Sequence, residues 1–165
     1  SMSLRLDKLL LDCCEKFRRP AEDKGLAFSY ENAYGSCEIM GDRYFLTEAF
    51  EHLLDNAVKF TSSGSVSLRL FTGSEQRAIV SVIDTGIGIS EAFLEKVFDP
   101  YLQEDMGYNR MYEGVGLGLT LVKLYLEAHG AAIDVSSRKG DGTRIDVTFP
   151  PHEQGIISRD TRGRF

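Results

Sequence analysis

The sequence predicts a single domain of the α+β class. Its 165 residues are enough for one domain with a substantial core. Apolar residues recur at helical spacing in three long segments, which predicts three amphipathic helices. Short alternating or β-branched apolar runs between those segments are typical of strands. No internal repeat is visible, so one compact unit is expected rather than an array.

Composition excludes several classes of protein. The formal net charge of −6 and the lack of a basic stripe argue against a nucleic-acid partner. No apolar run approaches the ~18 residues of a membrane span, and no signal peptide is visible. Cys13, Cys14 and Cys37 are odd in number and lack metal-ligand spacing, so they are expected to be reduced thiols in a cytoplasmic domain.

The ends of the chain are expected to lie outside the domain. Residues 1–2, Ser-Met, are typical of an expression-tag remnant, which predicts that the natural termini are missing. The domain is assigned to residues 3–150. Residues 151–165 are polar and are expected to form a tail or linker.

The N-terminal third is predicted to hold a helix, two strands and a second helix. Residues 4–18 carry an apolar face, and Pro20 with Gly25 is expected to end that helix. Residues 26–30 and 37–40 form short strands, predicted to pair as a hairpin. The second helix covers residues 43–60, with Asp42 as its N-cap.

The second helix also carries a polar stripe at helical spacing, formed by Glu48, His52, Asn56 and Lys59. A solvated helix face is one interpretation. Asn56 argues for another, because an Asn side chain competes for backbone hydrogen bonds inside a helix and is unfavourable there. A specific contact is therefore expected to hold it.

The stretch around which the chain is organised is the strand at residues 77–84 and the loop that follows it. The strand ends at Asp84, and Gly86 and Gly88 follow one residue apart. A carboxylate at the end of a buried strand can accept a hydrogen bond in a dry pocket, and the glycines leave room for a flat ligand. A plain strand-ending turn would explain the same residues.

The remaining elements follow in order. Strands are predicted at residues 65–71, 131–136 and 143–149, and a short helix at 91–98. Residues 101–113 form an irregular loop, which at this length is usually functional or disordered. Three glycines, Gly114, Gly116 and Gly118, then precede a helix that ends near His129. Glycines at a helix N-terminus can bind phosphate through backbone N–H groups, although a flexible hinge is the alternative.

The familiar nucleotide motifs do not fit these glycines. A dinucleotide fold needs a third glycine where Glu91 stands. The Walker phosphate loop and the protein-kinase motifs are absent from the sequence. A bound nucleotide would therefore require a different architecture.

Five motifs in order resemble the catalytic and ATP-binding domain of two-component sensor histidine kinases, within the ATPase superfamily that includes gyrase. They are the N box (residues 52–61, HLLDNAVKFT), the first glycine box (84–88, DTGIG), the F box (98–100, FDP), the second glycine box (114–119, GVGLGL) and the glycine-threonine motif (140–143, GDGT). The match covers roughly residues 4–150. Each motif alone is weak evidence, but five in this order are specific.

The resemblance implies a two-layer α/β sandwich of the Bergerat type, with a mixed sheet of about five strands and three helices on one face. It implies that Asp84 accepts a hydrogen bond from adenine, that Gly86 and Gly88 let the base approach, and that Thr143 completes the adenine wall, partly through water. Asn56 would coordinate Mg2+, a hard cation that prefers oxygen ligands.

Further roles implied by the resemblance concern the phosphates. Lys59 would contact phosphate, and Phe60 would pack near the nucleotide. The second glycine box, with Gly114, Gly116, Leu117, Gly118 and Leu119, would bind the polyphosphate through its backbone. Residues 101–113 would be a lid over ATP, with Arg110 as a candidate γ-phosphate contact.

Two features depart from the family pattern. His52 stands where many members have Asn and where gyrase-type hydrolases have a water-activating Glu. It is a candidate proton acceptor, or a residue that packs or donates a hydrogen bond. The phosphoacceptor His of full sensor kinases is also missing, because His52, His129 and His152 all lack its sequence context.

The resemblance therefore implies the phosphotransferase half of a histidine kinase, which uses ATP and Mg2+. Its partners would be a phosphoacceptor and dimerisation module and a downstream response regulator, with no nucleic acid and no membrane contact by this domain. The domain would be cytoplasmic, whether or not the parent protein is membrane-anchored. The alternative is a nucleotide-gated interaction module or slow ATPase of the same superfamily.

Overall fold

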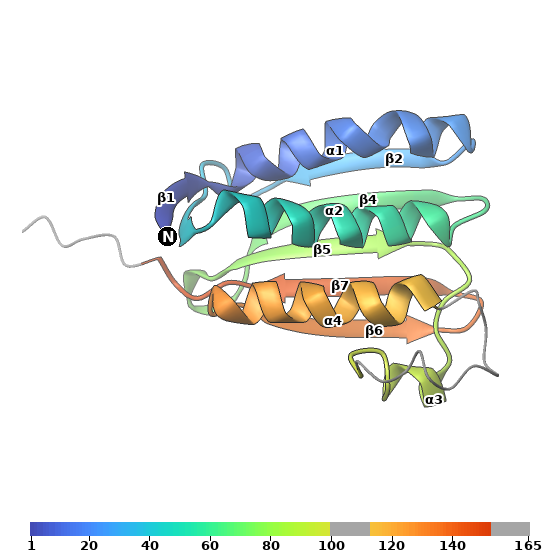
Figure 1. Ribbon diagram of the computed structural model, residues 1–165. Coiled ribbons are helices and arrows are strands. Elements are labelled where there is room, and N and C mark those ends of the chain that lie inside the picture. The colour runs from blue at the N-terminus through green and yellow to red at the C-terminus, as the bar shows by residue number, and fades with distance from the viewer. Residues whose placement is uncertain (100–112, 153–165) are drawn as a thin grey trace, which may run out of the picture.

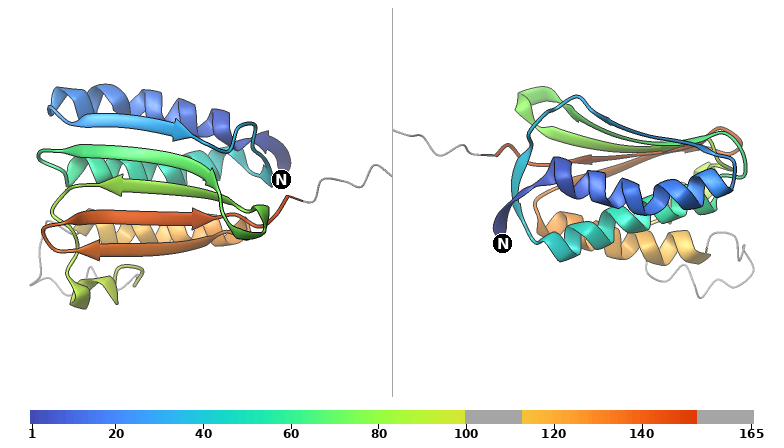
Figure 2. Two further views of the ribbon diagram at one scale, coloured as in Figure 1. Left: turned by 180° about the vertical axis from the view of Figure 1, so that it is seen from behind. Right: turned by 90° about the horizontal axis from the view of Figure 1, so that it is seen from above.

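The fold is a two-layer sandwich. The computed structural model describes the backbone of residues 1–99 and 113–152, and the side chains of these residues other than 113–118. A five-stranded sheet contains β2 (Ala27–Asn32), β4 (Ser65–Thr72), β5 (Ala78–Asp84), β7 (Gly142–Thr148) and β6 (Ala132–Arg138), in that spatial order. Helices α1 (Leu6–Asp23), α2 (Arg43–Lys59) and α4 (Glu113–Ala128) cover one face of it, as Figures 1 and 2 show.

The sheet is mixed. β2 runs parallel to β4, whereas β4, β5, β7 and β6 pair antiparallel. The predicted mixed sheet of about five strands with three helices on one face is thus confirmed. Among the described helices, none combines the length and the apolar character that a bilayer crossing requires.

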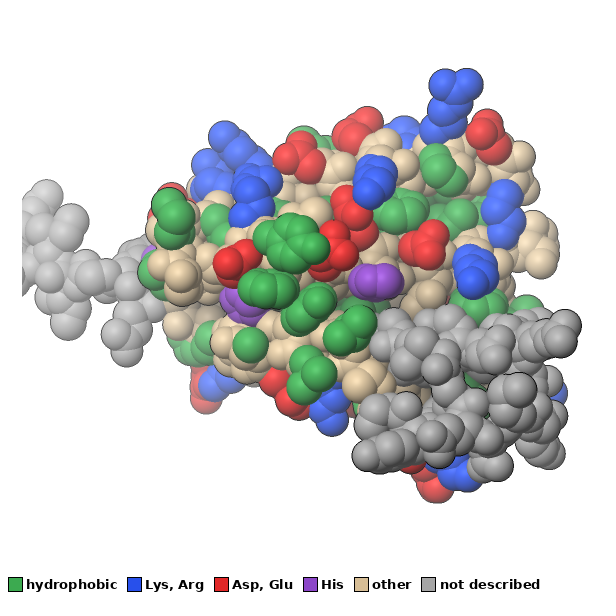
Figure 3. Space-filling model, viewed as in Figure 1, with side chains coloured by type: hydrophobic (Ala, Val, Ile, Leu, Met, Phe, Trp, Pro, Cys, Tyr) green, Lys and Arg blue, Asp and Glu red, His purple; other side chains and the backbone are tan. Residues whose placement is uncertain are grey.

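The core lies between the sheet and the helices. Alternate residues of each strand face it, as the period of two requires, and in β4 these are Val66, Leu68 and Leu70, all fully buried. The helices contribute fully buried Leu10 and Phe50. The outer helix surface keeps some large hydrophobic side chains exposed, namely Tyr44, Phe45, Leu121 and Leu124 (Figure 3).

The first helix is longer than predicted and begins later. Residues Met2–Arg5 form strand β1 instead of its first turn, and the helix continues through Pro20 to Asp23. The proposed stop at Pro20 was wrong because Pro20 lies within the last turn, and the residue after it, Ala21, is fully buried. Gly25 does end the helix, with φ +77°, a conformation that favours glycine.

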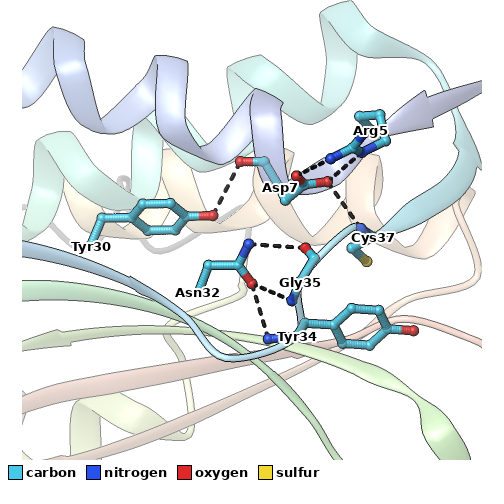
Figure 4. Close-up of polar contacts among 7 residues, drawn as sticks. All are labelled: Arg5, Asp7, Tyr30, Asn32, Tyr34, Gly35 and Cys37. Atoms are coloured by element: carbon cyan, nitrogen blue, oxygen red, sulfur yellow. Dashed lines mark hydrogen bonds and ion pairs between the residues drawn. The ribbon is translucent and has the colours of Figure 1, made fainter.

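The predicted hairpin of the next two strands was also wrong. β2 joins the main sheet beside β4, and β3 (Glu38–Gly41) pairs antiparallel with β1 in a separate two-stranded sheet. The turn between them explains the separation, because the Asn32 side chain accepts hydrogen bonds from the N–H groups of Tyr34 and Gly35 and redirects the chain. Figure 4 shows this turn.

Asp7 then holds the small sheet against α1 (Figure 4). Its carboxylate accepts from Arg5 Nε at 2.8 Å and from the Cys37 N–H at 3.0 Å, and its carbonyl accepts from the Tyr30 hydroxyl at 3.1 Å. One residue therefore joins β1, β2, α1 and the residue just before β3.

The second helix agrees with the prediction, including its cap. The Asp42 side chain accepts from the N–H groups of Tyr44 and Phe45. The helix predicted at 91–98 is shorter in the structure, because α3 covers only Glu91–Leu94 and is followed by turns whose hydrogen bonds join residues three apart. A single 3₁₀ turn, η1 (Ser74–Gln76), connects β4 to β5.

Candidate functional site

A pocket lies among the C-terminal half of α2, the end of β5 with the loop that follows it, Leu119 of α4 and the start of β7. In Figure 1, the C-terminal ends of α2 and β5 and the start of β7 lie at the right. Among the described residues, its polar lining consists of Asn56, Asp84 and Thr143. The rest is apolar apart from Gly88 and consists of Leu53, Ala57, Phe60, Val82, Ile87, Ile89, Leu119 and Ile145. A mostly apolar pocket with a few convergent polar groups is the usual form of a small-molecule site.

Asn56 reaches the pocket from the last turns of α2. Leu53 and Ala57, on the same helix, are buried and line the same pocket, so Asn56 lies at the edge of the buried face of α2. Its Nδ2 atom is buried and has no hydrogen-bond partner among the described residues. Leaving such a group unpaired costs about 1–3 kcal/mol, so the side chain is suited to a partner other than the described residues.

Asp84 is the last residue of β5 and is held by backbone donors. Its carboxylate accepts from the Gly86 N–H at 2.9 Å and also from the Thr143 N–H. Burial raises the pKa of the Asp84 carboxyl, and these two hydrogen bonds only partly offset it. The site thus keeps a carboxylate with little water around it, which is a strong acceptor for an N–H donor.

The two glycines after Asp84 are required by the chain's own packing. A Cβ on Gly86 would collide with the backbone oxygen of Phe60, to which the Ile87 N–H also donates. Gly88 has φ +69°, and a Cβ there would collide with the backbone oxygen of Arg138. Close backbone approach is therefore a second reason for these glycines, and the prediction that they also make room for a flat ligand stays untested. Contact of Gly88, which lines the pocket, with a base stays a prediction.

Thr143 faces Asp84 across the β5–β7 pair, with which it is in register. Its hydroxyl oxygen lies 2.8 Å from the hydroxyl oxygen of Ser137 on β6. Asp84 and Thr143 were predicted to meet at an adenine-binding wall, and the structure brings both into the lining of one pocket.

Three predicted residues lie on α2 around Asn56. Phe60 lines the pocket. Lys59 is exposed, with Nζ 5.6 Å from the centre of the Phe60 ring. His52 is half-buried one turn before Asn56 and is not part of the pocket lining. This geometry leaves both roles of His52, proton acceptor or packing residue, as predictions.

The second glycine box lies inside the helix rather than before it. α4 begins at Glu113, so Gly114, Gly116, Leu117 and Gly118 belong to its first turns. The first four N–H groups of a helix have no intrahelical acceptor, so the backbone of this segment still supplies donors. Leu119 lines the pocket. Arg110 and the proposed lid lie outside the described residues, except for Glu113.

Sequence reasoning missed several residues of the site. Ile87 and Ile89, which alternate with the glycines, form part of the apolar lining, and their alternation was a usable signal. Ser137 was missed altogether, because a serine in an edge strand gives no indication of what lies beside it.

The side chains that the structure describes do not form a metal centre by themselves. Within residues 1–99 and 113–152, no group of three or more His, Cys, Asp or Glu side chains could hold an ion. Mg2+ is commonly bound by one or two protein ligands together with substrate phosphates. The Asn56 side chain fits such an incomplete site, because its Nδ2 has no partner among the described residues and the oxygen and nitrogen of an amide exchange places when the group flips.

Comparison with known proteins agrees with this geometry. Residues 41–153 match the family described as histidine kinase-, DNA gyrase B-, and HSP90-like ATPase. The autoinducer 2 sensor kinase/phosphatase LuxQ of Vibrio parahaemolyticus is 40% identical over 143 residues, which are 82% of this chain and 17% of LuxQ. The sensor protein SrrB of Staphylococcus aureus is 32% identical over 90% of this chain and 24% of its own length. The chain thus spans less than a third of these relatives.

Solved structures resemble the fold as a whole. The mycobacterial sensor histidine kinase MprB superposes with a TM-score of 0.75 at 27% identity, covering 90% of this chain and 97% of that one. Full-length ShkA in complex with AMPPNP gives a TM-score of 0.75 at 28% identity, over 89% of this chain and 30% of ShkA. The family match covers most of the chain, and the five-stranded sheet and the pocket agree with it. The chain therefore belongs to the histidine kinase-, DNA gyrase B-, and HSP90-like ATPase family.

Proposed function

We propose that this domain binds Mg-ATP and transfers the γ-phosphoryl group to a histidine of a separate phosphoacceptor and dimerisation module, in two-component signalling. The observation that supports this most directly is the convergence of Asn56, Asp84 and Thr143 on one apolar pocket. The printed name of LuxQ, a sensor kinase/phosphatase, and the AMPPNP bound to ShkA point the same way.

Each polar residue has a distinct part in this proposal. Asp84 accepts a hydrogen bond from the adenine amino group, and Thr143 lies beside it. Asn56 supplies an oxygen ligand for Mg2+, with the phosphates supplying others, and Lys59 offers a positive charge near them. A Mg2+ ion held there would supply positive charge to offset the negative charge that develops on the phosphates during transfer.

The transfer itself requires an external acceptor. The bond between the γ-phosphorus and the β–γ bridging oxygen breaks, and ADP leaves with the electron pair. The unprotonated imidazole nitrogen of the acceptor bonds to phosphorus with its lone pair, and the proton on the other ring nitrogen is released. Positioning of the acceptor in line with the leaving oxygen contributes much of the rate. His52, one helical turn from Asn56, is the residue of this chain that we propose as acceptor of that proton.

The test follows radiolabel from γ-labelled ATP on two separate partners: this chain, and a phosphoacceptor module from a sensor histidine kinase. We expect acid-labile, base-stable label on the module and none on this chain. Asn56→Ala should abolish transfer, and His52→Ala should slow it. Glu48→Gln, on the same stripe of α2 and two turns before Asn56, is the matched control and should transfer at the wild-type rate.

Two results would contradict the proposal. Label on this chain alone would mean that one of its own histidines is an acceptor. Phosphate release without any label on the module would favour the slow ATPase instead.

A further inference from the structure

Ser137 lies on β6, beside the pocket but outside its lining. Its hydroxyl oxygen makes three contacts, each at 2.8 Å: with the Ile89 N–H, with the backbone oxygen of Gly142, and with the hydroxyl oxygen of Thr143. One side chain thus joins the loop after Asp84 to the β6–β7 turn.

The protons in these contacts can be assigned by elimination. A serine hydroxyl has one proton to donate and two lone pairs that accept. The Ile89 N–H occupies one lone pair. The Gly142 carbonyl can only accept, so it receives the Ser137 proton. The remaining contact must then be a donation from the Thr143 hydroxyl to the second lone pair of Ser137.

This assignment fixes what Thr143 offers to the pocket. Its only hydroxyl proton is directed at Ser137, so the oxygen that lines the pocket has lone pairs alone to offer. Asp84, in register with Thr143 on the neighbouring strand, is an acceptor as well when ionised. This edge of the pocket therefore carries acceptors side by side.

We propose that Ser137 is a positioning residue that sets purine specificity, because it orients the Thr143 hydroxyl as an acceptor next to Asp84. The inference rests on the proposed function, in that it takes the pocket to hold a nucleotide base. The exocyclic amino group of adenine donates to such an edge. The carbonyl oxygen at the same position of guanine is an acceptor and would face unpaired lone pairs, which a buried site penalises strongly.

Ser137→Ala tests this by freeing the Thr143 proton. The Thr143 hydroxyl could then turn and donate to the guanine carbonyl, so discrimination between the two bases should weaken. The measurement is calorimetric titration with ADP and with GDP, in Mg2+ at pH 8 so that Asp84 is ionised. We expect the wild type to prefer ADP, and the ratio of the two dissociation constants to shrink by about fivefold or more in Ser137→Ala.

Two further variants complete the design. Ser136→Ala is the matched control, because Ser136 is exposed on the opposite face of the same strand, and it should leave the ratio unchanged. Ser137→Thr retains the hydroxyl and should restore most of the discrimination. If Ser137→Ala does not fold, Ser137→Cys carries the same test, since a thiol is similar in size and a weak hydrogen-bond partner.

The ratio of the dissociation constants for GDP and ADP shows whether Ser137 sets base specificity or only supports the structure of the site. If Ser137→Ala weakens ADP and GDP by the same factor, or changes neither, Ser137 does not set specificity and the inference is wrong. If the wild-type protein binds neither nucleotide, it is the proposed function that fails, and this inference fails with it.

Discussion

The ionised carboxylate of Asp84 lowers the stability of the folded domain, while it is the group that we propose binds the base. Burial raises its pKa in the folded state, so the ionised form is less favourable there than in the unfolded chain. By linkage, the free energy of unfolding therefore decreases as pH rises from the ordinary pKa of Asp to the raised folded value, and the whole penalty remains above it. The carboxylate is thus retained against a cost in stability, which is typical of a functional group.

We predict that Asp84→Asn weakens ADP binding by roughly 1–3 kcal/mol, since a charged acceptor is replaced by a neutral amide. The same variant should leave the free energy of unfolding at pH 7 unchanged or higher. Calorimetry and urea denaturation give the two quantities. Asp134→Asn, at an exposed position on β6, is the charge-matched control. An unaltered ADP affinity in Asp84→Asn would remove the proposed adenine contact.

The pKa of Asp7 is shifted in the opposite direction to that of Asp84, so the ionised Asp7 stabilises the folded domain. The hydrogen bond from Arg5, and after it the Cys37 N–H, lowers the pKa of the Asp7 carboxyl against the effect of burial. Its stabilising contribution is therefore present above the ordinary pKa of Asp, about 3.9, and is lost as pH falls through the lowered folded value.

Asp7→Asn should accordingly be less stable than the wild type at pH 7, with the difference narrowing towards pH 3. Urea denaturation between these pH values measures it. Asp12→Asn, at an exposed position of the same helix, serves as the control. A difference that stays constant across the range would mean that the Asp7 charge does not contribute.

Sequence reasoning identified most of the polar site because chemically unusual residues stand out locally. Asn56 inside a helix and Asp84 before two glycines are such cases, and both line the pocket. Ser137 could not be identified, because its importance arises from the register of β6 with β7, which brings it beside Thr143. The register between two strands depends on both strands and on their packing, so it cannot be predicted from the sequence of one strand alone.

At the scale of elements, His129 connects the two helices that border the pocket, at their opposite end. Its Nε2 accepts from the Asp42 N–H at 2.9 Å, at the N-cap of α2. Its Nδ1 lies 2.6 Å from the Tyr125 carbonyl, which can only accept, so Nδ1 carries the proton. Gly41 leaves the space for the ring, because a Cβ there would lie 2.9 Å from His129 Cδ2.

We predict that His129→Ala lowers the free energy of unfolding by about 2 kcal/mol, since two hydrogen bonds worth ~1 kcal/mol each are lost. His129→Gln can still accept from Asp42, and His129→Asn can still donate to Tyr125, so each should lose about half as much. Urea denaturation provides the values, with exposed His152→Ala as the control. Equal stability of His129→Ala and wild type would show that this connection is dispensable.

The β6–β7 turn contains a matched pair of glycines. Gly140 and Gly142 both have positive φ, but only a Cβ on Gly142 would collide with another segment, the backbone of Asp84. Gly140→Ala should cost about 1–2 kcal/mol for the left-handed conformation alone. Gly142→Ala should cost more and also weaken ADP binding, since it displaces Asp84. Similar effects of both changes on ADP affinity would contradict this account.

Helices were predicted more accurately than strand pairing. The spacing of apolar residues located α1 and α2, because the amphipathic face of a helix is formed by residues close together in the sequence. The partners of β2 and β3 were predicted wrongly because both strands are short, and the partner of each is set by packing with residues far along the chain.

The whole molecule should respond to its ligand as one cooperative unit, since a single core joins sheet and helices. A ligand that binds only the folded state stabilises it by about 2.7 kcal/mol at a hundredfold excess over Kd. For a domain of this size, Mg-ADP should then raise Tm by about 5–11 °C. Thermal unfolding measures the shift, which should be smaller in Asp84→Asn, in proportion to its weaker ADP binding, and should persist in full in Asp134→Asn. An undiminished shift in Asp84→Asn would mean that ADP binds elsewhere.

The backbone contacts of Gly86 and Gly88 bear on how related sequences should be interpreted. Because the fold itself needs these glycines, a descendant that had lost nucleotide binding would still have to keep them. The fold does not require Asn56 or Asp84 in this way. Asn56 Nδ2 has no partner among the described residues, and Asp84 is a buried carboxylate, so both lower stability when no ligand is bound. A homologue that no longer binds nucleotide would therefore still carry the glycine motif. Replacement of Asn56 or Asp84, and not of the glycines, would indicate that nucleotide binding has been lost.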